Sequence, residues 1–267
     1  MTGSLPSILL VGFGKMGGAM FAGWRERGVA ASLAIDPALP APPGPELTVL
    51  ADAAAIPADF APAAVVLAVK PQNAATSLPQ VARFAGRAVF LSIMAGRSLA
   101  GMRGLLGAEA AIVRAMPNTP AAIRQGITVA CAGPGVTPAQ RTLCDSLLAA
   151  IGSVAWVDDE SLIDPVTAVS GGGPAYVFLL AELLERAAVE QGIPPDLARA
   201  LARQTVAGSG ALLAASAEDA AVLRRAVTSP KGTTERALAV LMAEDAWPAL
   251  ISRAIDAATR RSRELAG

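Results

Sequence analysis

The chain has 267 residues, 53% of them hydrophobic, and its 22 basic residues balance 22 acidic ones. This length suffices for two domains, and a net charge of zero leaves no basic field to attract nucleic acid or an anionic membrane. Histidine is absent and the two cysteines, Cys131 and Cys144, lie apart in apolar stretches. These counts exclude a Ser-His-Asp triad and predict no metal site, so we expect any chemistry to depend on a bound organic cofactor.

The N-terminus predicts neither export nor membrane insertion. Its first 18 residues, MTGSLPSILLVGFGKMGG, lack a basic region, and Lys15 interrupts the apolar run. We find no stretch of about 20 apolar residues without polar breaks, and therefore expect no membrane-spanning helix. Cys131 and Cys144 are interpreted as buried thiols in a reducing compartment. The sequence thus predicts a cytoplasmic globular protein.

Residues 1–158 alternate short apolar runs with helical patterns. Strands are predicted at 7–11, 32–36, 47–50, 64–69, 88–93 and 110–115, with further candidates at 127–131 and 153–157. The runs are continuous rather than alternating, which is typical of a parallel sheet covered on both faces. Helices are predicted between them, for example at 16–27 and 138–150, and the Pro-rich residues 37–46 form a surface excursion. The pattern predicts a doubly wound α/β domain.

Residues 159–267 have a different composition. Strand patterns disappear, and Ala/Leu-rich helices are predicted at 174–191, 195–215, 218–227, 233–243 and 246–264. Several of these helices are apolar nearly all round, and such helices are normally covered on every side. We therefore predict a second, all-helical domain that pairs with another copy of itself in a homodimer.

The segment GFGKMG after the first strand has the G-x-G-x-x-G spacing of a dinucleotide-binding turn. Gly12 permits the tight turn, Gly14 lets the backbone approach a pyrophosphate, and Gly17 packs helix on strand. Asp36 ends the second strand, where a carboxylate can accept hydrogen bonds from a ribose; alternatively it only starts a turn with Pro37. The predicted contacts in this region are Gly12, Phe13, Gly14, Lys15, Met16, Gly17 and Asp36.

Two further segments, LAVKPQN and RAMPNTPA, each begin at the end of a predicted strand. Ligands of open α/β sheets bind outside the carboxyl ends of the strands. Cofactor contacts are therefore predicted at Ala68, Val69, Lys70, Pro71 and Asn118. For Asn118, between two prolines, an ordinary turn residue is the alternative.

SGGGPAY, residues 170–176, is interpreted as a flexible loop leading into a helix, with free amides that suit an anion or cofactor. Tyr176, the only tyrosine, is either a proton donor or a core residue.

SPKGTT, residues 229–234, places three hydroxyls and a lysine at the start of a predicted helix. Backbone N–H groups of Gly232, Thr233 and Thr234 lie at the positive end of the helix dipole. The loop is interpreted as a cradle for a carboxylate or phosphate. The alternative is ordinary N-capping by Thr233 or Thr234.

Together these motifs resemble the pyrroline-5-carboxylate reductases, and the resemblance covers nearly the whole chain in order: GFGKMG, LAVKPQ, SIMAG, MPNTPA, SGGGPAYVF and LRRAVTSPKGTT. It implies a Rossmann domain followed by an all-helical dimerisation domain. It also implies that NADH or NADPH reduces the ring C=N of 1-pyrroline-5-carboxylate to L-proline. Asp36, with no arginine in the dozen residues after it, favours NADH competence.

The resemblance further implies that SPKGTT holds the substrate carboxylate, with Thr234 as the catalytic residue facing the ring nitrogen. The implied substrate contacts are Ser229, Lys231, Gly232, Thr233 and Thr234. The chain departs from the family pattern in three places that bear on substrate preference: Lys231 replaces a glycine of SPGGTT, Gly172 replaces the second serine of SGSGPAY, and Arg225 replaces an acidic residue.

Two other functions stay open. A β-hydroxyacid dehydrogenase shares the two-domain plan and uses a lysine as proton donor, and Lys231 is the only lysine of the helical half. It lies in a loop rather than on a helix, which argues against that function. A non-catalytic dinucleotide-binding sensor is the other alternative, and the intact donor loops in both domains argue against it.

Overall fold

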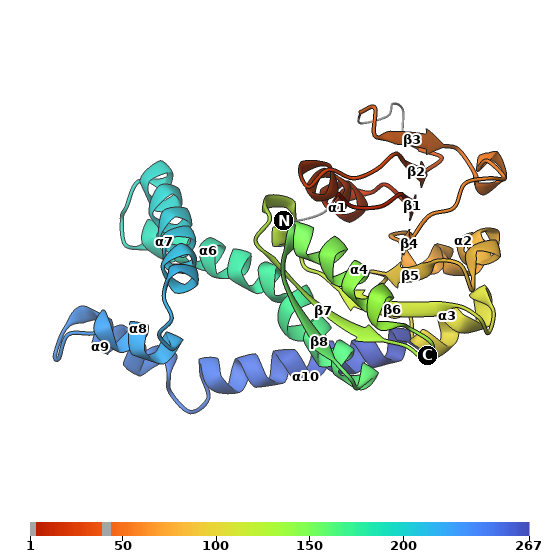
Figure 1. The fold of residues 1–267 in the computed structure, drawn as a ribbon. Helices are drawn as coiled ribbons and strands as arrows, with labels where there is room; N and C mark the ends of the chain where they lie inside the picture. Colours follow the sequence, from red (N-terminus) through yellow and green to blue (C-terminus); the bar gives the residue numbers. More distant parts are fainter. Residues whose placement is uncertain (1–3, 39–43, 267) are drawn as a thin grey trace. The chain divides into compact units, whose positions relative to one another are not determined.

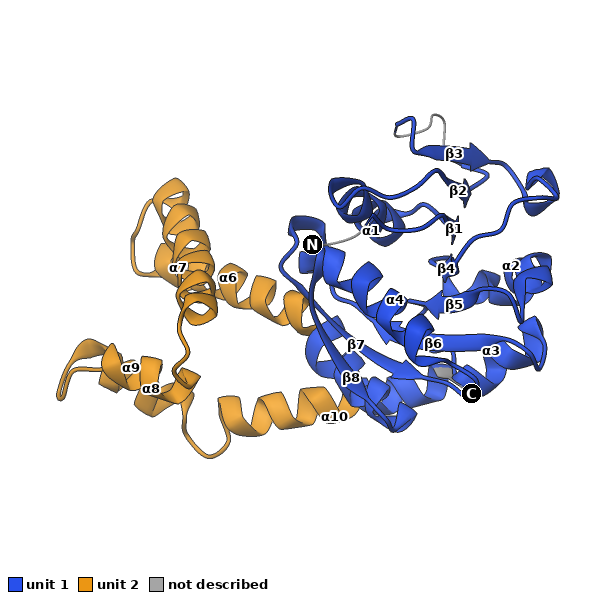
Figure 2. Ribbon diagram, in the orientation of Figure 1, with its two compact units in different colours: residues 1–171, 258–267 blue, residues 172–257 orange. Residues whose placement is uncertain are grey.

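The computed structural model describes residues 4–38 and 44–266, and its fold is drawn in Figure 1. Part of the predicted Pro-rich excursion, residues 39–43, lies outside the described residues. The chain forms two compact units (Figure 2): unit 1 is residues 1–171 with 258–267, and unit 2 is residues 172–257. The units divide at 171/172, later in the chain than the predicted boundary at 158/159, because the short helices after residue 158 contact strands of unit 1.

Unit 1 contains an eight-stranded sheet in the order β3-β2-β1-β4-β5-β6-β7-β8. The strands are β1 (Ile8–Val11), β2 (Ser32–Ile35), β3 (Leu47–Leu50), β4 (Ala64–Leu67), β5 (Val89–Ser92), β6 (Ala111–Met116), β7 (Gly126–Ala132) and β8 (Gly152–Val157). All eight predicted strands are confirmed. The first six have the doubly wound order, in which the chain reverses direction across the sheet between β1 and β4.

The sheet is parallel except for one pair: β7 runs antiparallel to β6, and β8 is parallel to β7. Only a short 3₁₀ turn, Thr119–Ile123, separates β6 from β7. A parallel connection needs a crossover of about a dozen residues or more, usually a helix, so this short link permits only a return in the opposite direction.

Helices cover both faces of the sheet. One face packs against α1 (Lys15–Glu26) and α4 (Pro138–Leu148), and the other against α2 (Ala74–Val81) and α3 (Leu99–Leu106). Alternate residues of β1 enter the two cores, so Leu10 joins the first cluster and Leu9 the second. Burial on both faces is why these strands read as continuous apolar runs.

Unit 2 is entirely helical and has almost no core of its own. Its helices are α6 (Gly173–Glu190), α7 (Pro195–Ala215), α8 (Ala220–Ala226), α9 (Thr233–Leu241) and the first part of α10 (Trp247–Ala266). Each begins and ends within two residues of its prediction. Among residues 172–257, all of them described, only Ala198 and Ala202 are buried. Large apolar side chains such as Phe178, which is 68% exposed, remain on the surface of the single chain.

The segment SGGGPAY is helical, and its interpretation as a flexible loop is wrong. Helix α5 (Ile163–Val166) continues into a π-helical turn, Thr167–Gly171, and α6 begins at Gly173. Residues 160–190 thus form one helical segment, and an 18-residue window within it has a mean hydropathy of 1.3. By length and composition the segment is long and apolar enough to cross a membrane. The expectation that no such stretch exists is therefore wrong. The three glycines add no polar side chain, so the apolar run continues through them.

Candidate functional site

The glycine-rich turn between β1 and α1 packs tightly against the end of β4. Gly12 has a φ of +94°, and a Cβ there would lie 2.8 Å from the carbonyl oxygen of Ala68. A Cβ on Gly17 would lie 2.6 Å from the carbonyl oxygen of Gly12. Both positions therefore require glycine, one for its backbone conformation and both for close approach. The contact lies at the β1–β4 reversal, where doubly wound sheets bind dinucleotides.

The N-terminus of α1 is open. Gly14 is the N-cap, no side chain caps the helix, and its first turn contains no acidic residue. A Cβ on Gly14 would meet nothing within 4 Å, and Lys15, the first helical residue, is exposed. Uncapped N–H groups at the positive end of a helix are suited to bind a phosphate. The turn therefore fits a dinucleotide pyrophosphate.

Asp36 connects the end of β2 to this turn. One carboxylate oxygen accepts a hydrogen bond from the Phe13 N–H at 2.7 Å, and the other accepts one from the Ala38 N–H at 2.9 Å. Asp36 therefore forms the turn that was predicted as the alternative to ribose binding. Ribose binding stays open as well, because each carboxylate oxygen can accept more than one hydrogen bond. The contact with Phe13 also holds the glycine-rich backbone in place.

Lys70 and Pro71 follow β4 at the same edge of the sheet, after Ala68 and Val69. The Lys70 side chain is exposed, and its backbone is extended ahead of a 3₁₀ turn that begins at Pro71. Arg97, in the loop after β5, donates from Nε and Nη2 to the Pro71 carbonyl oxygen, at 3.1 and 2.8 Å. The sequence prediction missed Arg97. The available signal was a charged residue just beyond a buried strand, in SIMAGR.

Asn118 joins three segments through its side-chain amide. Its Nδ2 donates to Ser170 Oγ at 3.3 Å, and its Oδ1 accepts from the Ile127 N–H at 3.0 Å. The residue lies just after β6, Ile127 belongs to β7, and Ser170 belongs to the π-helical turn. Asn118 is therefore more than the simple turn residue of the alternative interpretation, because its side chain makes both of these contacts. Met16 lies at the start of α1, half-buried against the first core cluster.

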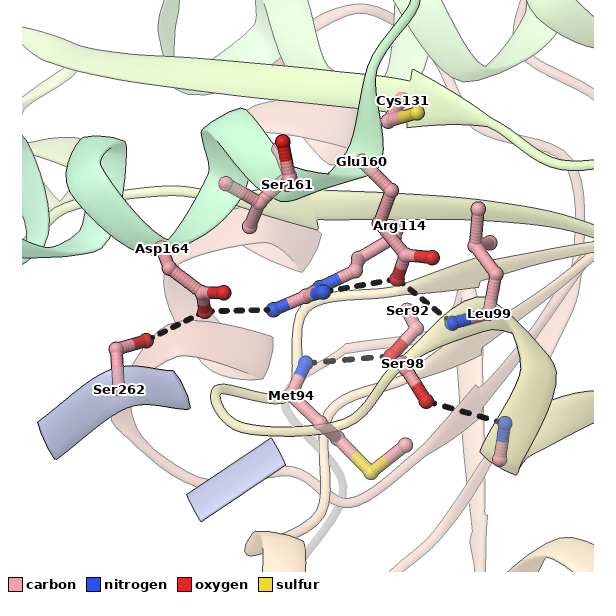
Figure 3. Close-up of polar contacts among 12 residues, drawn as sticks. Ser92, Met94, Ser98, Leu99, Arg114, Cys131, Glu160, Ser161, Asp164 and Ser262 are labelled. Atoms are coloured by element: carbon pink, nitrogen blue, oxygen red, sulfur yellow. Dashed lines mark hydrogen bonds and ion pairs between the residues drawn. The ribbon is translucent and has the colours of Figure 1, made fainter. Parts of the chain in front are cut away.

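Figure 3 shows a charged cluster around Arg114, which sequence reasoning missed. Arg114 of β6 forms ion pairs with Glu160 at 2.8 Å and Asp164 at 3.6 Å, and its side chain is only 4% exposed. An arginine within an otherwise apolar strand was the signal. Cys131, also near Glu160, has its thiol pKa raised first by burial, and burial raises the pKa of Cys144 to about 12. Both thiols are buried as predicted, and such thiols are unreactive.

In unit 2, the loop SPKGTT leads directly into α9. Gly232 is the N-cap and no side chain caps the helix, so the alternative of N-capping by Thr233 or Thr234 is not realised. The Gly232 N–H donates to the Ser229 carbonyl oxygen at 3.0 Å, which closes a turn. The hydroxyls of Thr233 and Thr234 are exposed and have no hydrogen-bond partner among the described residues. The open first turn of α9 thus offers backbone and hydroxyl donors together.

Lys231 adopts a glycine-like conformation, with a φ of +61°. Its N–H donates to the Glu235 carboxylate at 2.7 Å, and its side chain is exposed without an ion-pair partner among the described residues. A non-glycine residue in the left-handed region costs on the order of 1 kcal/mol. Glu235 was not anticipated as a partner of this loop.

Tyr176 lies half-buried on α6, within unit 2. In the single chain it is neither fully buried nor fully exposed, so both interpretations, proton donor and core residue, stay open.

Comparison with known proteins places this geometry in a family. Residues 160–265 match the model of pyrroline-5-carboxylate reductase dimerisation. A pyrroline-5-carboxylate reductase of Pseudomonas aeruginosa is 38% identical over 276 residues, covering 98% of each chain. A solved reductase structure from Coxiella burnetii has a TM-score of 0.87 at 30% identity and covers 97% of this chain and 98% of that one.

A pyrroline carboxylate reductase structure from Plasmodium falciparum, with NADP bound, has a TM-score of 0.82 at 25% identity and covers 98% of each chain. The similarity thus spans both the sheet, with its glycine-rich turn, and the helical segment containing SPKGTT. With a relative 38% identical along almost its entire length, this chain belongs to the pyrroline-5-carboxylate reductase family.

Proposed function

We propose that this protein reduces 1-pyrroline-5-carboxylate to L-proline with NADH or NADPH, the final step of proline biosynthesis. The observation that carries the proposal is the full-length similarity to the Pseudomonas aeruginosa reductase, which includes both donor loops. The uncapped starts of α1 and α9 supply the two anion-binding features that a dinucleotide and a carboxylate substrate require.

The residues of the glycine-rich turn would hold the cofactor pyrophosphate on the N-terminus of α1. Gly12 and Gly17 keep the turn close to β4, and Gly14 leaves open space for the phosphates. Asp36 would accept from the adenosine ribose, while Lys70 and Asn118 would orient the nicotinamide end. When bound, the reduced nicotinamide supplies the hydride for the reaction.

The loop SPKGTT would hold the substrate carboxylate. The Gly232 N–H is occupied by Ser229, so the N–H groups of Thr233 and Thr234, with the hydroxyls of Ser229 and Thr233, are the assigned donors. Lys231 adds a positive charge. A cyclic imine can bind already protonated, so hydride addition to the ring carbon yields the secondary amine without a histidine acid. Thr234 is assigned as the hydrogen-bond partner of the ring nitrogen.

The helical segment 159–267 is proposed as the substrate-binding and dimerisation domain, and residues 1–158 as the dinucleotide-binding domain. The family match over 160–265 supports this boundary. The apolar side chains exposed on α6, α7 and α10 would be covered by the second copy in a homodimer. Such pairing accounts for the apolar segment 160–190 without a membrane, and we propose that the enzyme is cytoplasmic.

The test is a coupled measurement of cofactor oxidation and product. Purified protein is mixed with 1-pyrroline-5-carboxylate and NADH or NADPH, the absorbance of the reduced nicotinamide is followed, and L-proline is quantified. We expect oxidation that depends on the imine and matches the proline formed. Cofactor binding without turnover would favour the sensor function. Turnover only with a 3-hydroxy acid and NAD⁺ would favour a β-hydroxyacid dehydrogenase.

A further inference from the structure

Arg114 connects β6 to three other segments of unit 1 through two carboxylates (Figure 3). Glu160, which pairs with Arg114, also accepts a hydrogen bond from the Leu99 N–H at the start of α3, at 2.7 Å. Asp164, the second partner, accepts one from Ser262 Oγ in the last turns of α10, at 2.7 Å. The guanidinium thus fixes the start of the helical segment 160–171 relative to β6.

The same two segments meet again a few residues further on. Asn118 follows β6, and Ser170 lies in the π-helical turn that continues α5; their side chains are 3.3 Å apart. β6 and the helical segment are therefore joined twice, by Arg114 with Glu160 and Asp164 at one end, and by Asn118 with Ser170 at the other. We call these three contacting pairs, Arg114–Glu160, Arg114–Asp164 and Asn118–Ser170, the clasp.

The burial of Arg114 makes its geometry specific. Its Nε is buried and has no hydrogen-bond partner among the described residues, so its two carboxylate contacts through Nη1 and Nη2 hold it in place. A planar guanidinium reaches two carboxylates at a fixed angle, which a lysine ammonium cannot reproduce. A change at Arg114 therefore alters the spacing between β6 and the helical segment rather than charge alone.

We propose that Arg114 is a positioning residue for cofactor binding, acting through Glu160 and Asp164 to hold Asn118 against Ser170 at the carboxyl edge of the sheet. The inference rests on the proposed function, because that function puts Asn118 at the nicotinamide end of the cofactor. In this inference Arg114 touches neither substrate nor cofactor, but it fixes the position of Asn118, which contacts the cofactor.

The test is a double-mutant cycle read out on cofactor affinity. The dissociation constant of NADH or NADPH is measured by fluorescence for the wild type, Arg114→Lys, Ser170→Ala and the double variant, in the full-length protein. We expect each single variant to weaken binding by about tenfold, within the range of coupling in one hydrogen-bond network. The double variant should bind the cofactor no more weakly than the weaker-binding single variant, because both changes release the same contact.

The split between kinetic constants separates positioning from general damage. At saturating cofactor, the Michaelis constant for 1-pyrroline-5-carboxylate should change by less than about twofold, because the substrate loop is untouched. The turnover number should fall, because a released Asn118 no longer orients the nicotinamide end. Trp156→Phe is the matched control. It removes the hydrogen bond from Trp156 to Asp145, at 2.9 Å, between β8 and α4, and should lower the melting temperature without changing cofactor affinity.

Two results would overturn the inference: an unchanged cofactor affinity in folded Arg114→Lys, or effects that multiply to about a hundredfold in the double variant. If Arg114→Lys does not fold, the near-isosteric Glu160→Gln takes its place in the cycle with the same expectation. A wild type that binds neither NADH nor NADPH refutes the proposed function. A wild type that binds them, with variants unaffected, refutes only the role of Arg114.

Discussion

Asp36 has one structural role and one proposed role at the same edge of the sheet. Its carboxylate holds the glycine-rich turn through the Phe13 N–H, and we propose that it also faces the ribose or its 2′-phosphate. We expect NADH to be used at least as well as NADPH, since a negative charge beside a 2′-phosphate is unfavourable. Asp36→Ser keeps a hydroxyl for Phe13 but removes the charge, and should raise relative efficiency with NADPH by about tenfold.

The measurement is kcat/KM with each cofactor in both proteins, alongside thermal unfolding to check that the turn is intact. A strong NADPH preference in the wild type that Asp36→Ser leaves unchanged would remove Asp36 from the ribose site.

Thr234 places a free hydroxyl on the first turn of α9. Thr234→Val nearly conserves volume and removes no contact seen in the single chain, so stability should be almost unchanged. Loss of a hydrogen bond to a charged group is worth about 1.5–3 kcal/mol, so the rate should fall roughly 10- to 150-fold. The matched control is Thr142→Val in α4, whose hydroxyl donates to the Pro138 carbonyl oxygen and whose loss should leave the rate unchanged. Activity of Thr234→Val within about twofold of wild type would exclude it from the reaction.

At the scale of elements, Lys231 in the turn before α9 has a backbone conformation that favours glycine. Lys231 has a φ of +61°, and the resemblance to the family implies glycine at this position. The turn is maintained by the hydrogen bonds from Gly232 to Ser229 and from Lys231 to Glu235, both through backbone N–H groups. Backbone geometry therefore tolerates the substitution, and the side chain is left to act by its charge.

We expect Lys231→Gly and Lys231→Met to raise the Michaelis constant for 1-pyrroline-5-carboxylate by about fivefold, as for a solvated charge pair, with little change in kcat. Lys231→Gly also relieves the left-handed backbone strain, whereas Lys231→Met retains it and is the cleaner test of charge. Steady-state kinetics across a range of pH check both. A thousandfold fall in kcat for Lys231→Met with binding preserved would make Lys231 an acid catalyst and favour the β-hydroxyacid dehydrogenase function.

At the scale of the whole molecule, the helices of unit 2 leave their apolar side chains on the surface of the single chain. A unit of 86 residues with only Ala198 and Ala202 buried has little core of its own to stabilise it. We expect a dimer in sedimentation at micromolar concentration, and Phe178→Asp should dissociate it. Ile123→Asp, in unit 1 and equally exposed at 68%, is the matched control and should leave the dimer intact. A monomeric wild type would contradict the homodimer.

The sequence by itself determined the elements. Strands buried on both faces are continuous apolar runs, and this local pattern placed all eight strands and the long helices. Gly12 and Gly17 were recognisable because their spacing follows from the turn itself. The clasp was not recognisable, since Arg114 and Asn118 lie far along the chain from Glu160, Asp164 and Ser170, and their pairing is not encoded in any local period.

Only the tertiary structure decided how those elements connect. The antiparallel direction of β7 follows from the short link after β6, and the helical course of SGGGPAY follows from its continuity with α5. Likewise, the Gly232 N–H donates to the Ser229 carbonyl oxygen, so only the N–H groups of Thr233 and Thr234 remain to bind the anion. The physical reason is that periodicity and turn chemistry act between nearby residues, whereas strand direction and hydrogen-bond partners depend on groups that only folding brings together.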